Sequence, residues 1–102
     1  MTTTPEGKVK DKIKALLKAY GAYYAMPIGS TYGKQGVPDF LACCHGQFIG
    51  IEAKADATKQ PTKLQQRNLQ CIKDSWGIAL VIHDGNLEQL EETLKWCIQK
   101  IV

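Results

Sequence analysis

Arginine and long apolar runs are scarce in this sequence. The first shortage limits how the protein could contact phosphate, and the second excludes a membrane-spanning protein. Of the 13 basic residues only Arg67 is an arginine, so phosphate contacts would depend mostly on lysine point charges and not on bidentate guanidinium groups. The longest apolar runs, 40–44 and 78–82, are far shorter than the ~20 residues that cross a bilayer. The N-terminal stretch lacks the apolar core of a secretory signal. We therefore expect an intracellular, cytoplasmic protein with no membrane partner, located in the host cytoplasm if a phage encodes it.

Metal-binding cysteine patterns are also absent. The four cysteines form no CxxC pair and no Cys/His pattern with zinc-finger spacing. We predict four reduced thiols in the core and no disulfide framework, with adjacent strand residues pointing to opposite faces: Cys43, Cys44, Cys71 and Cys97. The main aromatic residues are expected in the core or at a subunit interface rather than stacked on bases: Tyr20, Tyr23, Tyr24, Trp76 and Trp96.

The remaining composition is that of one ordinary globular domain. The chain has 102 residues, 44% of them hydrophobic and 23% charged, and a net charge of +3. This mild basic excess permits a polyanionic partner without requiring one. We expect residues 1–102 to form a single stand-alone domain.

Caps, glycines and apolar periodicity divide the chain into seven elements. Helices are predicted from Thr4-Pro5 to about residue 20, from Thr62 through Trp76, and from an Asn86 cap onward. Strands are predicted at 23–27, 37–44, 47–55 and 78–83. The order α-β-β-β-α-β-α predicts an α/β fold with a mixed central sheet flanked by helices.

Two carboxylates are predicted to meet across the central hairpin. A tight turn at His45-Gly46 would place Asp39 opposite Glu52, with Cβ atoms roughly 4.5 to 5.5 Å apart, where the two charges repel. Lys54 shares the strand face of Glu52 and supplies one positive charge. A divalent cation would balance the pair better, and hard oxygen ligands select Mg²⁺ or Mn²⁺ over zinc. These are the parts of a phosphodiester hydrolase.

Two further polar residues fall on helix faces that are otherwise apolar. The apolar stripe of the first helix, extended back by three residues, reaches Glu6, although a solvated acid in the first turn is the alternative. The stripe of the second helix extends back to Gln65, although the neighbouring Gln66 could take the inward place instead.

The sequence resembles a known nuclease superfamily at these positions. Gly-Val-Pro-Asp at 36–39 and Ile-Glu-Ala-Lys at 51–54 resemble the PD-(D/E)xK motif of restriction-endonuclease-like nucleases, whose core order is αβββαβ. More narrowly, 24–27, the glycine loop 29–36 and Pro-Thr-Lys-Leu-Gln at 61–65 resemble the viral-type replication and repair nuclease domain, VRR-NUC.

The resemblance implies a metal-dependent endodeoxyribonuclease. Asp39, Glu52 and the backbone carbonyl of Ala53 would bind Mg²⁺ or Mn²⁺, and Lys54 would be the catalytic lysine. Glu6 would support the metal site through water or as a ligand of a second ion. Gln65 would orient water or Lys54.

The same resemblance implies a branched-DNA substrate and a homodimer. Similar stand-alone domains act as small dimeric resolvases, which nick a four-way (Holliday) junction symmetrically in DNA repair. Ser30, Tyr32 and Lys34 of the glycine loop are candidate DNA contacts, with a solvated loop as the alternative. The lysines of the first helix form either a solvated face or a track for a second DNA arm. Two rival functions stay open: a catalytically silent module that binds branched DNA, and a subunit active only in a larger assembly.

Overall fold

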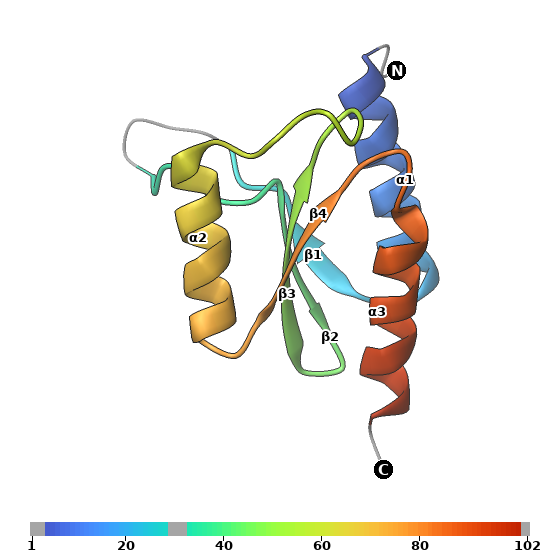
Figure 1. The fold of residues 1–102 in the computed structure, drawn as a ribbon. Helices are drawn as coiled ribbons and strands as arrows, with labels where there is room; N and C mark the ends of the chain where they lie inside the picture. The colour runs from blue at the N-terminus through green and yellow to red at the C-terminus, as the bar shows by residue number, and fades with distance from the viewer. Residues whose placement is uncertain (1–3, 29–32, 101–102) are drawn as a thin grey trace.

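The computed structural model describes residues 4–28 and 33–100, and the predicted order of elements is confirmed (Figure 1). The elements are α1 (Pro5–Ala19), β1 (Tyr23–Ala25), β2 (Phe40–Cys44), β3 (Gln47–Ala53), α2 (Lys63–Asp74), β4 (Ile78–Ile82) and α3 (Leu87–Gln99). Within these described residues, no helix has the length and apolar character that a bilayer crossing requires.

The four strands form one mixed sheet in the order β1-β2-β3-β4. The first two pairs are antiparallel, and β3 pairs with β4 in parallel. Helices α1 and α3 cover one face of the sheet and α2 covers the other (Figure 1). This three-layer arrangement is the predicted α/β fold with a mixed sheet between helices.

The β2–β3 hairpin turns at His45 and Gly46, as predicted. Both residues have positive φ, 50° and 81°, which a two-residue turn needs in order to match the twist of the strands. The turn sets a register that pairs Phe40 with Ile51. If that register is continued by one position, Asp39 and Glu52 are the next residues to face each other.

The core lies between the sheet and the α1–α3 layer. Alternate residues of the hairpin point into it, because strand side chains alternate between faces. The fully buried large side chains come from both helices and from strands β2 to β4: Ile13, Leu17, Phe40, Cys44, Ile49, Ile51, Ile82, Leu90, Leu94 and Cys97. The intervening hairpin positions, including Glu52, face the side covered by α2.

Both central strands are shorter than the sequence predicted. β2 begins at Phe40 and not at Val37, because Pro38 has no N–H for the ladder and Asp39 uses its side chain, not its backbone, to reach Ala53. β3 ends at Ala53, although Lys54 still donates its N–H to Ile82 O at 2.9 Å. β4 is an edge strand, and three of its five residues are only half-buried.

The end of α2 also differs from the prediction. The helix stops at Asp74, and Trp76 has φ of 69° in the left-handed region that glycine usually occupies at a helix end. Gly77 donates its N–H to Ile72 O at 2.8 Å, which completes the C-terminal cap. Trp76 therefore leaves the apolar stripe of the helix and is 92% exposed.

Two of the cysteines expected in the core, Cys43 and Cys71, lie at the surface. Tyr23 and Trp96, which were expected in the core or at a subunit interface, are not in the core and are exposed in the single chain. Cys44 and Cys97 are buried as predicted, and all four thiols are free. The side chain of Asn86 does not cap α3; it accepts the N–H of His83 and closes the preceding turn instead.

Candidate active site

The predicted site residues come together at the end of the sheet opposite the β2–β3 turn. Because the hairpin closes at His45-Gly46, the start of β2 and the end of β3 lie side by side at the other end. Asp39 immediately precedes β2, and Glu52 lies near the end of β3. The first turn of α2 brings Gln65 to the same end, and the first turns of α1 approach from the opposite face (Figure 1).

Asp39 is fixed by the strand beside it. Its Oδ2 accepts the Ala53 N–H at 2.8 Å, which holds the carboxylate next to Glu52, and its Oδ1 takes no part in this bond. The predicted meeting of Asp39 and Glu52 follows from this side-chain bond as much as from the hairpin register.

Glu52 is a buried acid that lacks a full set of partners. The residue is 2% exposed, and its Oε2 lies 3.4 Å from the Lys54 Nζ. Among the described residues, its Oε1 has no hydrogen-bond partner. Burial raises the pKa of Glu52 from an ordinary 4.5 to about 7; the charge of Asp39 adds to the rise, and Lys54 opposes it.

Lys54 is held by the first turn of α2. Its Nζ lies 3.3 Å from the Gln65 Oε1, which also accepts the Thr62 N–H at 2.8 Å in a capping box. Gln66 instead donates to the Pro61 carbonyl in the exposed loop. The structure thus selects Gln65, and not Gln66, as the glutamine beside Lys54.

Lys10 is a site residue that the sequence reasoning missed. Its Nζ lies 3.6 Å from the Asp39 Oδ1 and 3.6 Å from the Glu6 Oε2. The signal was available, because Lys10 follows Glu6 by four residues and so shares its helix face. The Glu6 side chain is 43% exposed, so Glu6 lies at the rim of the site and reaches Asp39 through Lys10.

Comparison with solved structures identifies this arrangement of elements. A solved chain described as "VRR_NUC domain" has 22% sequence identity to this chain and a TM-score of 0.71. The similarity covers 98% of this chain and 100% of that one. The chain has the VRR_NUC fold. No family model matches the sequence, and no curated protein matches it.

The fold implied by the sequence resemblance is therefore confirmed as restriction-endonuclease-like. In this VRR_NUC fold, the positions that resemble the PD-(D/E)xK motif are the ones that converge, namely Asp39, Glu52 and Lys54. The roles of these residues stay predictions, as do those of Glu6, Gln65 and the Ala53 carbonyl.

The donor set of this VRR_NUC fold fits a hard divalent cation. Glu52 offers a buried oxygen that has no hydrogen-bond partner in the described part of the chain, and Asp39 offers Oδ1, which lies 3.6 Å from a partly exposed lysine. Oxygen donors of this kind suit Mg²⁺ or Mn²⁺. Within residues 4–28 and 33–100, no three His, Cys, Asp or Glu side chains gather as a ready-made metal cluster. A cation would need the two carboxylates together with backbone oxygen and water.

The loop before Asp39 is anchored to α2. The Asn68 side chain, which is nearly buried, donates to Gln35 O at 3.1 Å and to Leu64 O at 2.9 Å. Gly36 has φ of 76°, and a Cβ there would lie 2.6 Å from Leu64 Cγ. These contacts fix the direction in which the chain enters β2, and the sequence alone did not single out Asn68.

The candidate DNA contacts are only partly described. Ser30 and Tyr32 lie outside the described residues. Lys34 is exposed and borders an apolar hollow that also includes Ile28 and Phe48. The expectation that Lys34 contacts DNA stays a prediction.

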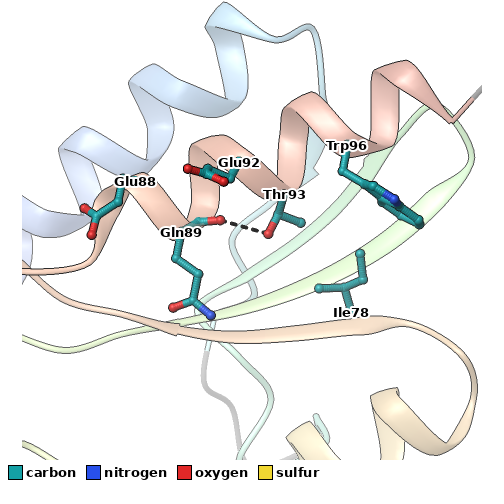
Figure 2. A pocket seen from close by; sticks show the side chains of 6 residues that line it. All are labelled: Ile78, Glu88, Gln89, Glu92, Thr93 and Trp96. Atoms are coloured by element: carbon teal, nitrogen blue, oxygen red, sulfur yellow. Dashed lines mark hydrogen bonds between the residues drawn. The ribbon is translucent and has the colours of Figure 1, made fainter.

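A groove on the described part of the protein lies away from the carboxylate site. Figure 2 shows it along α3, with Ile78 of β4 facing the helix, and its volume is about 540 Å³. Its lining residues are Ile78, Glu88, Gln89, Glu92, Thr93 and Trp96. No lysine is among them, so this groove lacks the carboxylate–lysine pairing that distinguishes the end of the sheet.

Proposed function

We propose that this chain is a metal-dependent endodeoxyribonuclease that hydrolyses DNA phosphodiester bonds. The observation that carries the proposal is the buried Glu52, whose Oε1 has no partner among the described residues. An unpaired buried acid costs folding free energy, and such groups cluster at functional sites. Asp39 beside it and the VRR_NUC fold around it both favour a nuclease centre.

Asp39 and Glu52 are the proposed cation ligands, with the Ala53 carbonyl as a third. A bound Mg²⁺ or Mn²⁺ supplies Lewis-acid stabilisation of the phosphate and lowers the pKa of water. Asp39 is positioned for this role by the Ala53 N–H, and Glu52 is positioned by Lys54. The cation would also remove the cost of burying the Glu52 charge.

Lys54 is the proposed catalytic lysine. Its ammonium can donate both to an attacking water and to a phosphate oxygen that gains negative charge in the transition state. Gln65 accepts a hydrogen bond from Lys54 and so limits the positions of its Nζ. The side-chain oxygen of Gln65, Oε1, also accepts the Thr62 N–H. The same atom therefore takes part in the helix cap and holds the catalytic lysine. Glu6 is proposed to support the site from its rim, through water or a second ion.

The proposed substrate is branched DNA, with a four-way junction as the main candidate, and the proposed active form is a homodimer. Two sites across a two-fold axis can make the paired nicks that such a junction needs. Trp96 of α3 is 51% exposed and offers an apolar contact for this interface. We expect a particle in solution with twice the 11.3 kDa chain mass, and we expect it to nick the junction in pairs. A monomer that makes single nicks contradicts this part of the proposal.

The decisive experiment is a cleavage panel of labelled single-stranded, duplex, flap and four-way-junction DNA with Mg²⁺, Mn²⁺ or EDTA. Wild type is compared with Glu52→Gln and with Glu92→Gln, which removes the same charge from an exposed position on α3. We expect metal-dependent cleavage that is lost only in Glu52→Gln. If the protein binds the junction but does not cleave it at any metal concentration, the proposal of an enzyme is wrong and a catalytically silent DNA-binding module takes its place. Activity that appears only with an added partner would indicate a subunit of a larger assembly.

A further inference from the structure

Each of the two carboxylates at the site already has its own lysine. Lys54 Nζ lies 3.4 Å from Glu52 Oε2, and Lys10 Nζ lies 3.6 Å from Asp39 Oδ1. Two ammonium groups thus lie against the two carboxylates, and one of them, that of Lys10, also pairs with Glu6 at the rim of the site. A divalent cation between the carboxylates would be repelled by both ammonium groups at short range, so binding favours the departure of one lysine.

The two lysines differ in how firmly they are held. The Lys54 side chain is 14% exposed and is hydrogen-bonded to Gln65. The Lys10 side chain is 31% exposed and has a second acidic partner, Glu6, one helical turn away. Lys10 can therefore give up Asp39 and keep an ion pair, whereas Lys54 cannot leave Glu52 without disturbing the anchor on α2.

We propose that Lys10 is a placeholder cation, which neutralises Asp39 in the metal-free protein and competes with the divalent cation for that carboxylate. This inference rests on the proposed metal site. When the cation binds, Lys10 gives up Asp39, keeps its ion pair with Glu6 and turns toward the open rim. Lys10 is then a positioning residue, because it acts on the reaction through the occupancy of Asp39.

The competition between Lys10 and the cation predicts the direction in which the Mn²⁺ affinity changes when Lys10 is replaced. Removal of a positive charge a few ångströms from a divalent cation tightens binding of that cation, here by about tenfold for charges partly screened by water. Lys10→Met should therefore bind Mn²⁺ about tenfold more tightly than wild type in the absence of DNA. Lys10→Arg keeps the charge and should stay close to wild type.

Lys14 provides a matched control. It lies one turn further along α1 and pairs with Asp11 at 3.8 Å, so Lys14→Met removes the same charge from the same helix without touching Asp39. Mn²⁺ affinity is measured by titration of the purified metal-free protein, with free Mn²⁺ followed by electron paramagnetic resonance. Glu52→Gln is included to report whether the proposed metal site is the one that is titrated.

The outcomes separate the two proposals. Tighter binding in Lys10→Met, with Lys14→Met and Lys10→Arg near wild type, supports the placeholder role. Equal Mn²⁺ affinity in Lys10→Met and Lys14→Met overturns the placeholder role. Weaker Mn²⁺ binding in Lys10→Met also overturns it, because Lys10 would then help to form the metal site. In either of those cases, loss of binding in Glu52→Gln leaves the proposed metal site intact. Absence of Mn²⁺ binding in wild type and in Lys10→Met overturns both proposals.

Discussion

Replacement of Glu52 with glutamine is expected to stabilise the metal-free protein above neutral pH, although it should abolish cleavage. Burial raises the pKa of Glu52 from 4.5 to about 7 in the folded protein. Below pH 4.5 the carboxyl is protonated in both the folded and unfolded states, so it contributes no pH dependence. Between pH 4.5 and 7 only the unfolded state ionises, and the free energy of unfolding falls as pH rises.

The size of this effect follows from the two pKa values. Each pKa unit corresponds to about 1.4 kcal/mol, so the full penalty above pH 7 is about 3 kcal/mol. Glutamine has nearly the shape of the neutral acid and does not ionise, so Glu52→Gln should avoid most of that penalty. In a domain of this size, about 3 kcal/mol corresponds to more than 10 °C in the melting temperature.

Thermal unfolding followed by circular dichroism in EDTA, from pH 5 to pH 8, measures the difference. Glu52→Gln should melt close to wild type at pH 5 and well above it at pH 8, whereas the exposed Glu92→Gln should follow wild type throughout. Added Mn²⁺ should then stabilise wild type at pH 8 more than Glu52→Gln, because the cation binds only the folded site. A wild-type stability that does not fall between pH 5 and 8, or a less stable Glu52→Gln at pH 8, would refute the reasoning.

Three further predictions concern the supports of the site and the end of α2. Gln65→Ala and Thr62→Ala should each lower the free energy of unfolding by about 1 kcal/mol through loss of the capping box, but only Gln65→Ala should lower kcat. Gly36→Ala should cost about 2–4 kcal/mol in urea unfolding because it adds a clash to backbone strain, whereas Gly21→Ala, at φ of 70° with open space around it, should cost only the strain. Trp76→Gly should stabilise the protein by about 0.5–1 kcal/mol in the same assay, because it relieves a left-handed backbone and loses little buried area; a destabilised variant contradicts that view.

Local signals in the sequence were sufficient for much of the fold. Thr4 with Pro5 and Thr62 with Gln65 specify where two helices begin, since a cap depends only on residues within one turn. The two-residue turn at His45-Gly46 fixes the hairpin register, because a tight turn leaves little freedom in how its strands pair. From that register, the meeting of Asp39 and Glu52 could be predicted before any contact was known.

Only the tertiary structure decided the properties that depend on packing between distant segments. Glu52 is buried because α2 covers the far face of the sheet, and its Oε1 has no partner in the part of the chain that the structure describes; no spacing in the sequence encodes either property. The choice of Gln65 over Gln66 depends on the angle at which α2 meets Lys54. Lys10 joins the site because α1 lies over the sheet end that carries Asp39, although the two residues are far apart in the chain. The sequence determined which groups are available and which local elements carry them. Their distances and exposure, and hence their charge states, arise only when those elements pack together.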